Sequence, residues 1–384
     1  MEALFRGEMG IDFRSFYMKR SFEQAGQTTG QESLAFGGSV GYRTRWWKNV
    51  RAGATVFTSQ GSVFTDPDKS GAGILGPRQT GYNVLGHAYV QGRLSKTEFT
   101  AGRQELVTPF VNPYDVRMTP YAFEAYTIQS KEITGLTFVA SHVAKIKKWT
   151  STDFDYMSDA AGLTGSHRPL TMAGAVYEPS AGYRFQFWDY YCYDFMNVFY
   201  FQGDKEWDLG RGFFFLGSAQ MINQHDVGSA LAGTFNTSMA GVRATLKWKD
   251  LGLTLAYTAT DTNHDVFNPW GGYPGYTSIM EEDNDRAGEN TWLASLFYDF
   301  SSLGAEGLNF FTIYTDSSTP KTGPHASPSQ REMDFNLRFR PKSFLKGLSL
   351  RMRACYVSQD KSMGGKDIAD YRIILNYRLP IGSW

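Results

Sequence analysis

LSLRMRACY, residues 348–356, alternates between apolar and polar side chains at almost every position. Side chains on a β-strand point to opposite faces in turn, so a period of two predicts a strand with one apolar face and one polar face. The segments 334–340 (DFNLRFR) and 371–379 (YRIILNYRL) have the same pattern, with aromatic and aliphatic residues on one face and arginines on the other. The C-terminal part of the chain therefore predicts three consecutive amphipathic strands.

The composition favours a membrane barrel over a helical membrane protein or a soluble globule. Aromatic residues make up 16% of the 384 residues, which suits a protein anchored at two membrane interfaces. A transmembrane helix needs about 20 consecutive apolar residues, whereas the longest apolar runs, such as 198–201 and 213–216, are short. A β-barrel is the other structure that satisfies every backbone polar group inside lipid.

Alternating segments recur along the whole chain, the first over 9–20 and the last over 368–379, and they number eighteen. Short turns such as 95–96 and 249–250 separate them on one side. Long polar segments separate them on the other side: 61–80, 105–120, 147–168, 262–290 and 317–331. A soluble sandwich has no reason to keep its long loops on one side. We therefore expect an all-β fold: a single transmembrane antiparallel β-barrel over residues 1–384, with about eighteen strands, short periplasmic turns and longer external loops, in the outer membrane of a Gram-negative bacterium.

Catalytic and cofactor signatures are missing from the sequence. The six histidines are scattered over different segments, and no GxSxG, HExxH or glycine-rich phosphate motif occurs. Cys192 and Cys355 lie outside any CxxC or Cys/His cluster, and they fall on strands that should be nearly opposite in the ring. We expect no enzyme activity, no cofactor, no metal site and two free thiols. The balance of 38 basic and 38 acidic residues gives no reason to expect a nucleic-acid partner.

The arginines of the terminal strands form a pattern of their own. If the aromatic face of each strand is turned to lipid, strand periodicity sends seven arginines to the lumen on neighbouring strands: Arg14, Arg338, Arg340, Arg351, Arg353, Arg372 and Arg378. A guanidinium is always charged and presents a planar fork to a carboxylate, so a ladder of weak sites would pass an anion from one to the next. The alternative is that these charges only hydrate the lumen.

The segment 105–120 contains three prolines and several apolar side chains, which suit it poorly to an exposed loop. We expect it to fold into the barrel and narrow the pore with Tyr114, Asp115 and Arg117. The alternative is an ordinary external loop with a local Asp115–Arg117 pair. The acidic segment 281–285 (EEDND) could attract cations, bind a divalent ion or only solvate the mouth, and the sequence leaves these three open.

Several motifs resemble the OprD family of substrate-specific outer-membrane porins. The most specific run is in and around the third long loop: Gly102-Arg103-Gln104, Thr108-Pro109-Phe110, Asn112-Pro113, Asp115, Arg117-Met118, Pro120 and Phe123-Glu124. The segments 286–292 (RAGENTW), 346–353 (KGLSLRMR) and 372–377 (RIILNY) fit as well. This chain departs from the pattern at Ala125, where the family is expected to have glycine, and in its rather short external loops.

The resemblance implies an eighteen-stranded channel with an inward third loop and a basic ladder, which passes small carboxylate-bearing molecules. The expected partners are small anionic solutes, outer-membrane lipid and lipopolysaccharide, and the barrel could be a monomer or a trimer. One alternative is a general nonspecific diffusion porin. Another is a barrel that serves as a scaffold or sheath around a periplasmic partner, which would require a wide lumen without an infolded third loop.

Overall fold

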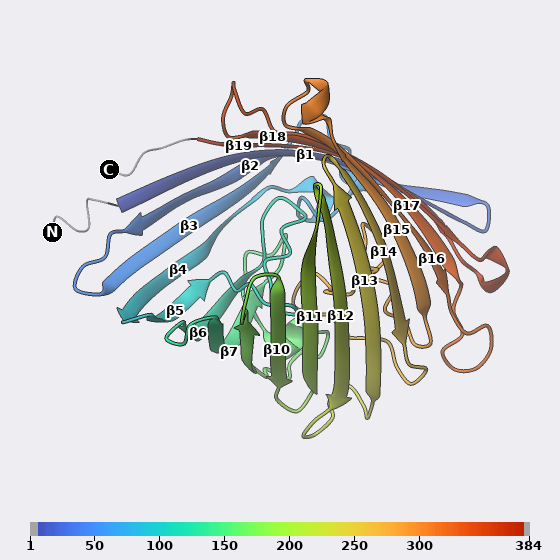
Figure 1. Ribbon diagram of the computed structural model, residues 1–384. Coiled ribbons are helices and arrows are strands. Elements are labelled where there is room, and N and C mark those ends of the chain that lie inside the picture. The colour runs from blue at the N-terminus through green and yellow to red at the C-terminus, as the bar shows by residue number, and fades with distance from the viewer. Residues whose placement is uncertain (1–6, 380–384) are drawn as a thin grey trace.

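The computed structural model describes residues 7–379, and nearly all of its regular structure is β-strand (Figure 1). Each strand is antiparallel to its neighbours. The strands are β1 (Gly7–Gln24), β2 (Gln27–Thr44), β3 (Val50–Gly61), β4 (Tyr82–Leu94), β5 (Thr97–Gln104), β6 (Ala122–Ser130), β7 (Leu136–Lys147), β8 (Asp155–Tyr156), β9 (Leu170–Tyr177), β10 (Tyr183–Cys192), β11 (Met196–Gly210), β12 (Phe213–Asp226), β13 (Asn236–Trp248), β14 (Leu251–Thr260), β15 (Asn290–Asp299), β16 (Leu308–Ser318), β17 (Gln330–Phe339), β18 (Leu348–Gln359) and β19 (Asp367–Arg378).

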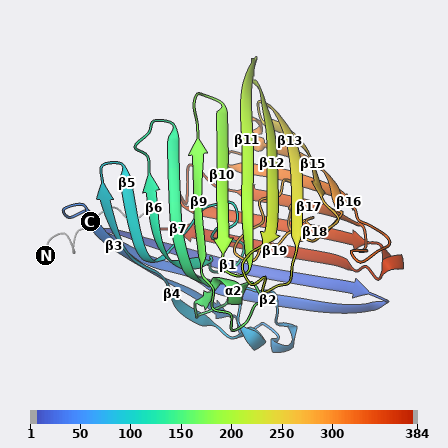
Figure 2. The same cartoon turned by 90° about the horizontal axis from the view of Figure 1, so that it is seen from below.

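The sheet closes because the first and last strands pair with each other. The register of β1 against β19 runs from Asp12 opposite Arg378 to Glu23 opposite Asp367. The two-residue strand β8 pairs only with β7, and β7 continues the ring by pairing with β9. Among the described residues the ring therefore contains eighteen strands, which confirms the predicted number and the closed barrel (Figure 2).

Connections of two kinds lie at the two ends of the barrel. One end, here called the turn edge, carries connections such as 95–96, 211–212 and 249–250. The other end, the loop edge, carries every long loop that the sequence predicted: 62–81, 105–121, 148–169, 261–289 and 319–329. In chain order 105–121 is the third loop, 148–169 the fourth and 261–289 the seventh.

In residues 7–379, helical structure is confined to short segments of the connections. The one α-helical turn of this range, α2 (Met157–Ala160), belongs to the fourth loop and lies inside the outline of the ring (Figure 2). The four 3₁₀ turns are η1 (Pro67–Lys69), η2 (Pro77–Gln79), η3 (Phe300–Leu303) and η4 (Lys361–Met363). No helix in the described part of the chain is long and apolar enough to span a membrane.

The outward and inward faces differ as the alternation predicted. On β17, Phe335 and Leu337 are each 38% exposed on the outer wall, whereas the alternating residues Asp334 and Asn336 are buried on the inner side. The same outward exposure of large apolar side chains recurs around the ring, for example at Phe36, Val90, Tyr126, Val242 and Leu255. An apolar outer wall with a polar inner face is the arrangement that a lipid-embedded barrel requires.

The largest apolar core lies inside the barrel and not between sheets. It joins inward side chains of β6, β7 and β9–β13 to Phe110 of the third loop, Met157 of the fourth and Trp270 of the seventh. Cys192 of β10 belongs to this core, whereas Cys355 lies on β18. Both are buried free thiols, which confirms that they form no disulfide.

A glycine at the β1–β2 seam offers a test of the barrel wall. Gly38 has φ = 136°, and an added Cβ would lie 1.8 Å from the Asp12 carbonyl oxygen. We expect Gly38→Ala to destabilise the barrel by at least about 1–3 kcal/mol from backbone strain alone. The measurement is unfolding of the purified barrel in urea and detergent. Gly10→Ala is the matched control on the paired strand, since a Cβ added there would have no atom within 4 Å. Equal stability of the two variants would contradict the seam geometry.

Candidate solute pathway

The third loop crosses the interior because its apolar residues are buried against the far wall. The ring of Phe110, which is fully buried, lies 5.7 Å from that of Tyr190, 6.1 Å from Tyr200 and 6.3 Å from Tyr273. These partners belong to β10, β11 and the seventh loop. Burial of a phenylalanine side chain is worth about 1.5–3 kcal/mol, so this contact holds the loop inside the barrel.

A reciprocal pair of hydrogen bonds joins the third and seventh loops. Asn112 Nδ2 donates to the carbonyl oxygen of Gly272 at 2.9 Å, and the amide of Gly272 donates to Asn112 Oδ1 at 2.8 Å. Glycine is needed here because a Cβ at Gly271 or Gly272 would lie 2.6 Å from Asn112 or 2.8 Å from Tyr114. The two loops therefore form one connected layer across the lumen.

Of the three residues predicted to narrow the pore, only Asp115 faces the open lumen. Its two carboxylate oxygens accept from the Arg14 guanidinium at 2.6 and 2.9 Å. Tyr114 packs on Trp149 with ring centroids 4.9 Å apart. Arg117 is buried with its guanidinium 4.6 Å above the same Trp149 ring. The local Asp115–Arg117 pair considered from the sequence is not formed, because Asp115 binds the barrel wall instead.

The seven arginines of the predicted ladder are brought to one wall, on β17, β18, β19 and β1. Arg338 lies directly opposite Arg351, and Arg353 opposite Arg372, while Arg14 faces Asn376 across the closing pair. Arg340 follows the end of β17. Their electrostatic surroundings divide them into two groups.

Three of the seven are neutralised by carboxylates. Arg14 is bound to Asp115, and Arg378 donates to Asp12 at 2.6 Å at the turn edge. Arg372, only 2% exposed, donates to Asp370 at 2.9 Å and forms a second ion pair with Glu281 of the seventh loop. Such paired guanidiniums join loops and neighbouring strands, and the bound carboxylate cancels part of their charge.

The other four, Arg338, Arg340, Arg351 and Arg353, are here called the unpaired arginines. Within residues 7–379 no carboxylate lies within ion-pair distance of them. Arg351 and Arg353 donate to the amide oxygen of Asn336 at 3.0 and 2.8 Å. The Nε groups of Arg338 and Arg351 have no hydrogen-bond partner in the described structure.

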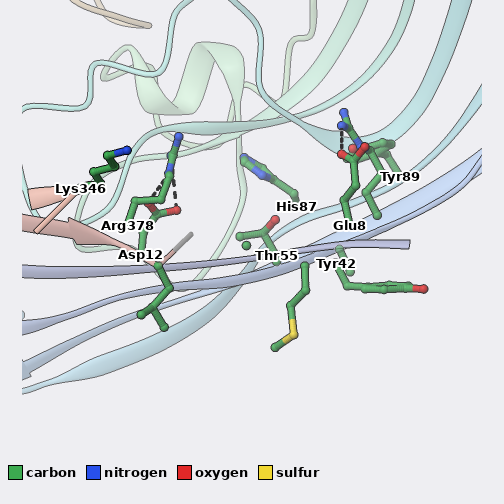
Figure 3. A pocket seen from close by; sticks show the side chains of 15 residues that line it. Glu8, Asp12, Tyr42, Thr55, His87, Tyr89, Lys346 and Arg378 are labelled. Carbon is green, nitrogen blue, oxygen red and sulfur yellow. Dashed lines mark hydrogen bonds and ion pairs between the residues drawn. The ribbon is translucent and has the colours of Figure 1, made fainter. Parts of the chain in front are cut away.

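A cavity of about 1030 Å³ lies at the turn edge beside this wall. It is lined by side chains from β1, β16 and β19, from the third loop and from the β17–β18 turn, among them Arg14, Glu105, Asp115, Asn309, Arg340, Lys342 and Asn376. A second cavity of about 560 Å³ shares Asp12, His87 and Arg378 with it and includes Lys346 (Figure 3). In Figure 3 His87 lies between the Asp12–Arg378 pair and Glu8, so charged groups of both signs surround this mouth.

Some pathway residues were missed by the sequence reasoning. Arg20 binds Glu281 and Asp370, and its position on β1 shares the inward face of Arg14, so alternation alone could have found it. Asn336 accepts hydrogen bonds from two of the unpaired arginines, Arg351 and Arg353. It lies on the inward face of β17, so alternation could have indicated it as well. The role of Glu281 had no local signal, because its partners are distant in sequence.

The closed barrel, apolar outer wall, infolded loop and polar lumen define an outer-membrane channel. The sequence model for outer membrane porins of the OprD family matches residues 7–381, and this chain belongs to that family. Porin D of Pseudomonas aeruginosa is 23% identical over 349 residues, which cover 82% of this chain and 77% of Porin D.

Solved structures have the same fold. The crystal structure of Pseudomonas aeruginosa OccK9 (OpdG) matches 99% of this chain and 100% of its own with 22% identity and a TM-score of 0.89. That of Pseudomonas aeruginosa OpdK matches 97% of this chain and 98% of its own with 18% identity and a TM-score of 0.85. The chain is thus a porin of the Gram-negative outer membrane and not an enzyme, with its turn edge in the periplasm and its loop edge outside.

The packing of Phe110 predicts how the third loop affects conduction. Phe110→Ala removes about 3–5 kcal/mol of core packing and frees the loop from β10 and β11. We expect higher single-channel conductance and noisier open-state current in planar bilayers. Val107→Ala is the matched control in the same loop, because Val107 is 73% exposed. If Phe110→Ala conducts like the wild type, the loop does not limit the pathway.

Glu105 predicts a pH dependence of ion preference. Its side chain borders the lumen but is surrounded by the barrel, and this burial, with the nearby charge of Asp115, raises the Glu105 pKa above 4.5. As pH falls from neutral, Glu105 gains its proton before an ordinary glutamate does, so the lumen loses negative charge and anion preference rises. Reversal potentials in a KCl gradient at several pH values measure this effect. Glu105→Gln should make the rise in anion preference smaller at pH values above 4.5, and an unchanged profile would contradict the assignment.

Proposed function

We propose that this porin passes small anionic solutes by passive diffusion, with carboxylates as the favoured class, along the unpaired arginines Arg338, Arg340, Arg351 and Arg353. The observation that carries the proposal is that these four charges share one wall of the lumen without carboxylate partners in residues 7–379. In the proposed arrangement, the apolar outer wall lies against outer-membrane lipid and the external loops lie against lipopolysaccharide.

The geometry of the unpaired arginines suits transient binding. Asn336 orients Arg351 and Arg353 through its amide oxygen, which is neutral, so these hydrogen bonds do not cancel the charge of either guanidinium. A guanidinium also presents a planar fork of donors to a carboxylate. A guanidinium in a water-filled path attracts a unit anion at 4 Å by about 1 kcal/mol, which is weak enough to permit release.

The proposed pathway uses four of the seven arginines that the sequence predicted as a ladder. Arg14, Arg372 and Arg378 are assigned the task of holding the third loop, the seventh loop and the closing strands, because each is bound to a carboxylate. An anion would have to compete with a carboxylate of the protein at each of these three. The carboxylate class also draws support from the OpdK structure, which was solved with vanillate, an aromatic carboxylate.

Two alternatives differ in what they require of the lumen. A general nonspecific porin would treat the unpaired arginines as hydration only, and the experiment below separates it from the proposal. A sheath around a periplasmic protein requires a lumen without an infolded third loop. Phe110 and Val111 are fully buried inside the ring, which argues against the sheath.

The proposal is tested by replacing three unpaired arginines with glutamine. Arg338→Gln, Arg351→Gln and Arg353→Gln together keep approximate size and hydration but remove three charges from the wall. We expect loss of chloride preference and about a fivefold lower benzoate flux at low salt, since one contact is worth about 1 kcal/mol in water. High salt should weaken the difference by screening. Reversal potentials and liposome-swelling rates measure the two quantities.

Arg331→Gln is the matched control for charge. Arg331 lies on the same strand β17 but on the outward face, where it is 67% exposed and paired with Asp316. It should leave both quantities unchanged. If the triple variant behaves like this control, the arginines only hydrate the lumen and the nonspecific porin is the correct description.

A further inference from the structure

Beneath the seventh loop, three potential metal ligands meet on the inner wall. Asp334 of β17 and Cys355 of β18 lie directly opposite each other in the strand register, and Glu332 is two residues from Asp334 on the same face. One ligand atom from each residue lies within 4.8 Å of the other two. All three side chains are at most 1% exposed. Strand pairing thus builds a compact set of two carboxylates and one thiol.

The hydrogen bonding of this set is unequal. Glu332 accepts from the backbone amides of Met280 at 3.1 Å, Glu281 at 2.9 Å and Glu282 at 2.9 Å, which fixes its carboxylate under the seventh loop. The Cys355 thiol donates to Glu332 Oε1 at 3.1 Å. Neither carboxylate oxygen of Asp334 has a hydrogen-bond partner in the described structure, although both are buried. A buried carboxylate without partners costs several kcal/mol unless a proton or a cation compensates it.

Within the described residues, Asp334 has no direct charged partner. The guanidiniums of Arg351 and Arg353 act on its carboxylate through space, but in residues 7–379 no arginine forms an ion pair or a hydrogen bond with it. A cation held by the set would supply that partner.

We propose that Glu332, Asp334 and Cys355 form a binding site for one divalent cation of the zinc class. The thiolate favours a borderline-soft metal over Mg²⁺ or Ca²⁺, which prefer oxygen ligands alone, and three protein ligands leave a fourth tetrahedral position for water. On binding, the Cys355 S–H bond breaks, a metal–sulfur bond forms and the proton is released to solvent. The site lies on the loop-edge side of Arg338, Arg351 and Arg353 on the same two strands, β17 and β18.

The probe for this site is Co²⁺, because a cobalt–thiolate bond absorbs in the near ultraviolet. The full-length barrel is stripped with EDTA under reducing conditions, refolded in detergent with Co²⁺ and freed of excess metal on a desalting column. We expect one bound Co²⁺ per barrel with a thiolate-to-cobalt charge-transfer band. Zn²⁺ should abolish the band by displacement, whereas excess Mg²⁺ or Ca²⁺ should not.

Cys192 supplies the matched control, because it is the other cysteine of the chain and is also buried, within the apolar core. Cys192→Ser should keep the band, and Cys355→Ser should lose it. Asp334→Asn keeps the thiol and should weaken Co²⁺ binding by at least about tenfold. A folded barrel and a heat-unfolded barrel migrate differently on gel electrophoresis, and this difference verifies that each variant is folded. If Cys355→Ser does not fold, the Co²⁺ affinity of Asp334→Asn tests the proposal instead.

Three results would overturn the proposal. The first is a folded wild-type barrel without bound Co²⁺ or without a charge-transfer band. This would mean that a proton shared between Glu332 and Asp334 compensates the buried charge. The second is displacement of Co²⁺ by Ca²⁺, which would contradict the zinc class. The third is a band that survives Cys355→Ser or disappears in Cys192→Ser.

Discussion

The structure depends on the closure of its backbone hydrogen-bond ring inside lipid. No water is available in the hydrocarbon region, so each strand must pair on both sides, and β1 and β19 supply the last pairing. This constraint fixes the even number of antiparallel strands and turns one face of every strand outward. The lumenal positions of Arg338, Arg351 and Arg353 follow from it, because a strand that turned them outward would expose charge to lipid.

Within the ring, the loops determine which arginines of the wall are paired with a carboxylate and which are not. Asp115 of the third loop and Glu281 of the seventh loop each neutralise arginines of the wall, and both loops are tied together through Asn112 and Gly272. The apolar core around Phe110 supplies the packing that keeps these carboxylates in place. The interior therefore has an apolar, loop-filled side at β6–β13 and a basic side at β17 and β18.

Alternation and loop spacing were sufficient to predict the fold from the sequence, because both are local properties of the chain. They indicated the strand number, the common edge of the long loops and the inward face of the ladder arginines. They could not indicate the partners of those arginines, since Arg14 and Asp115 are 101 positions apart and Arg372 and Glu281 are 91 apart. The sequence did not indicate that Cys355 lies beside Asp334. Motif spacing relates only residues that are close in sequence, whereas these two are paired between the neighbouring strands β17 and β18.

The closing contacts also have a consequence for assembly. Arg14 and Asn376 are separated by 362 positions, and Asp12 and Arg378 by 366, so these bonds form only after nearly the whole chain is in place. Contacts of such long range are slow to form, because the entropy of closing the chain must be overcome first. A nascent barrel that lacks its last strand therefore has an open seam beside the unfinished solute path. The solute path is therefore complete only once β19 has paired with β1.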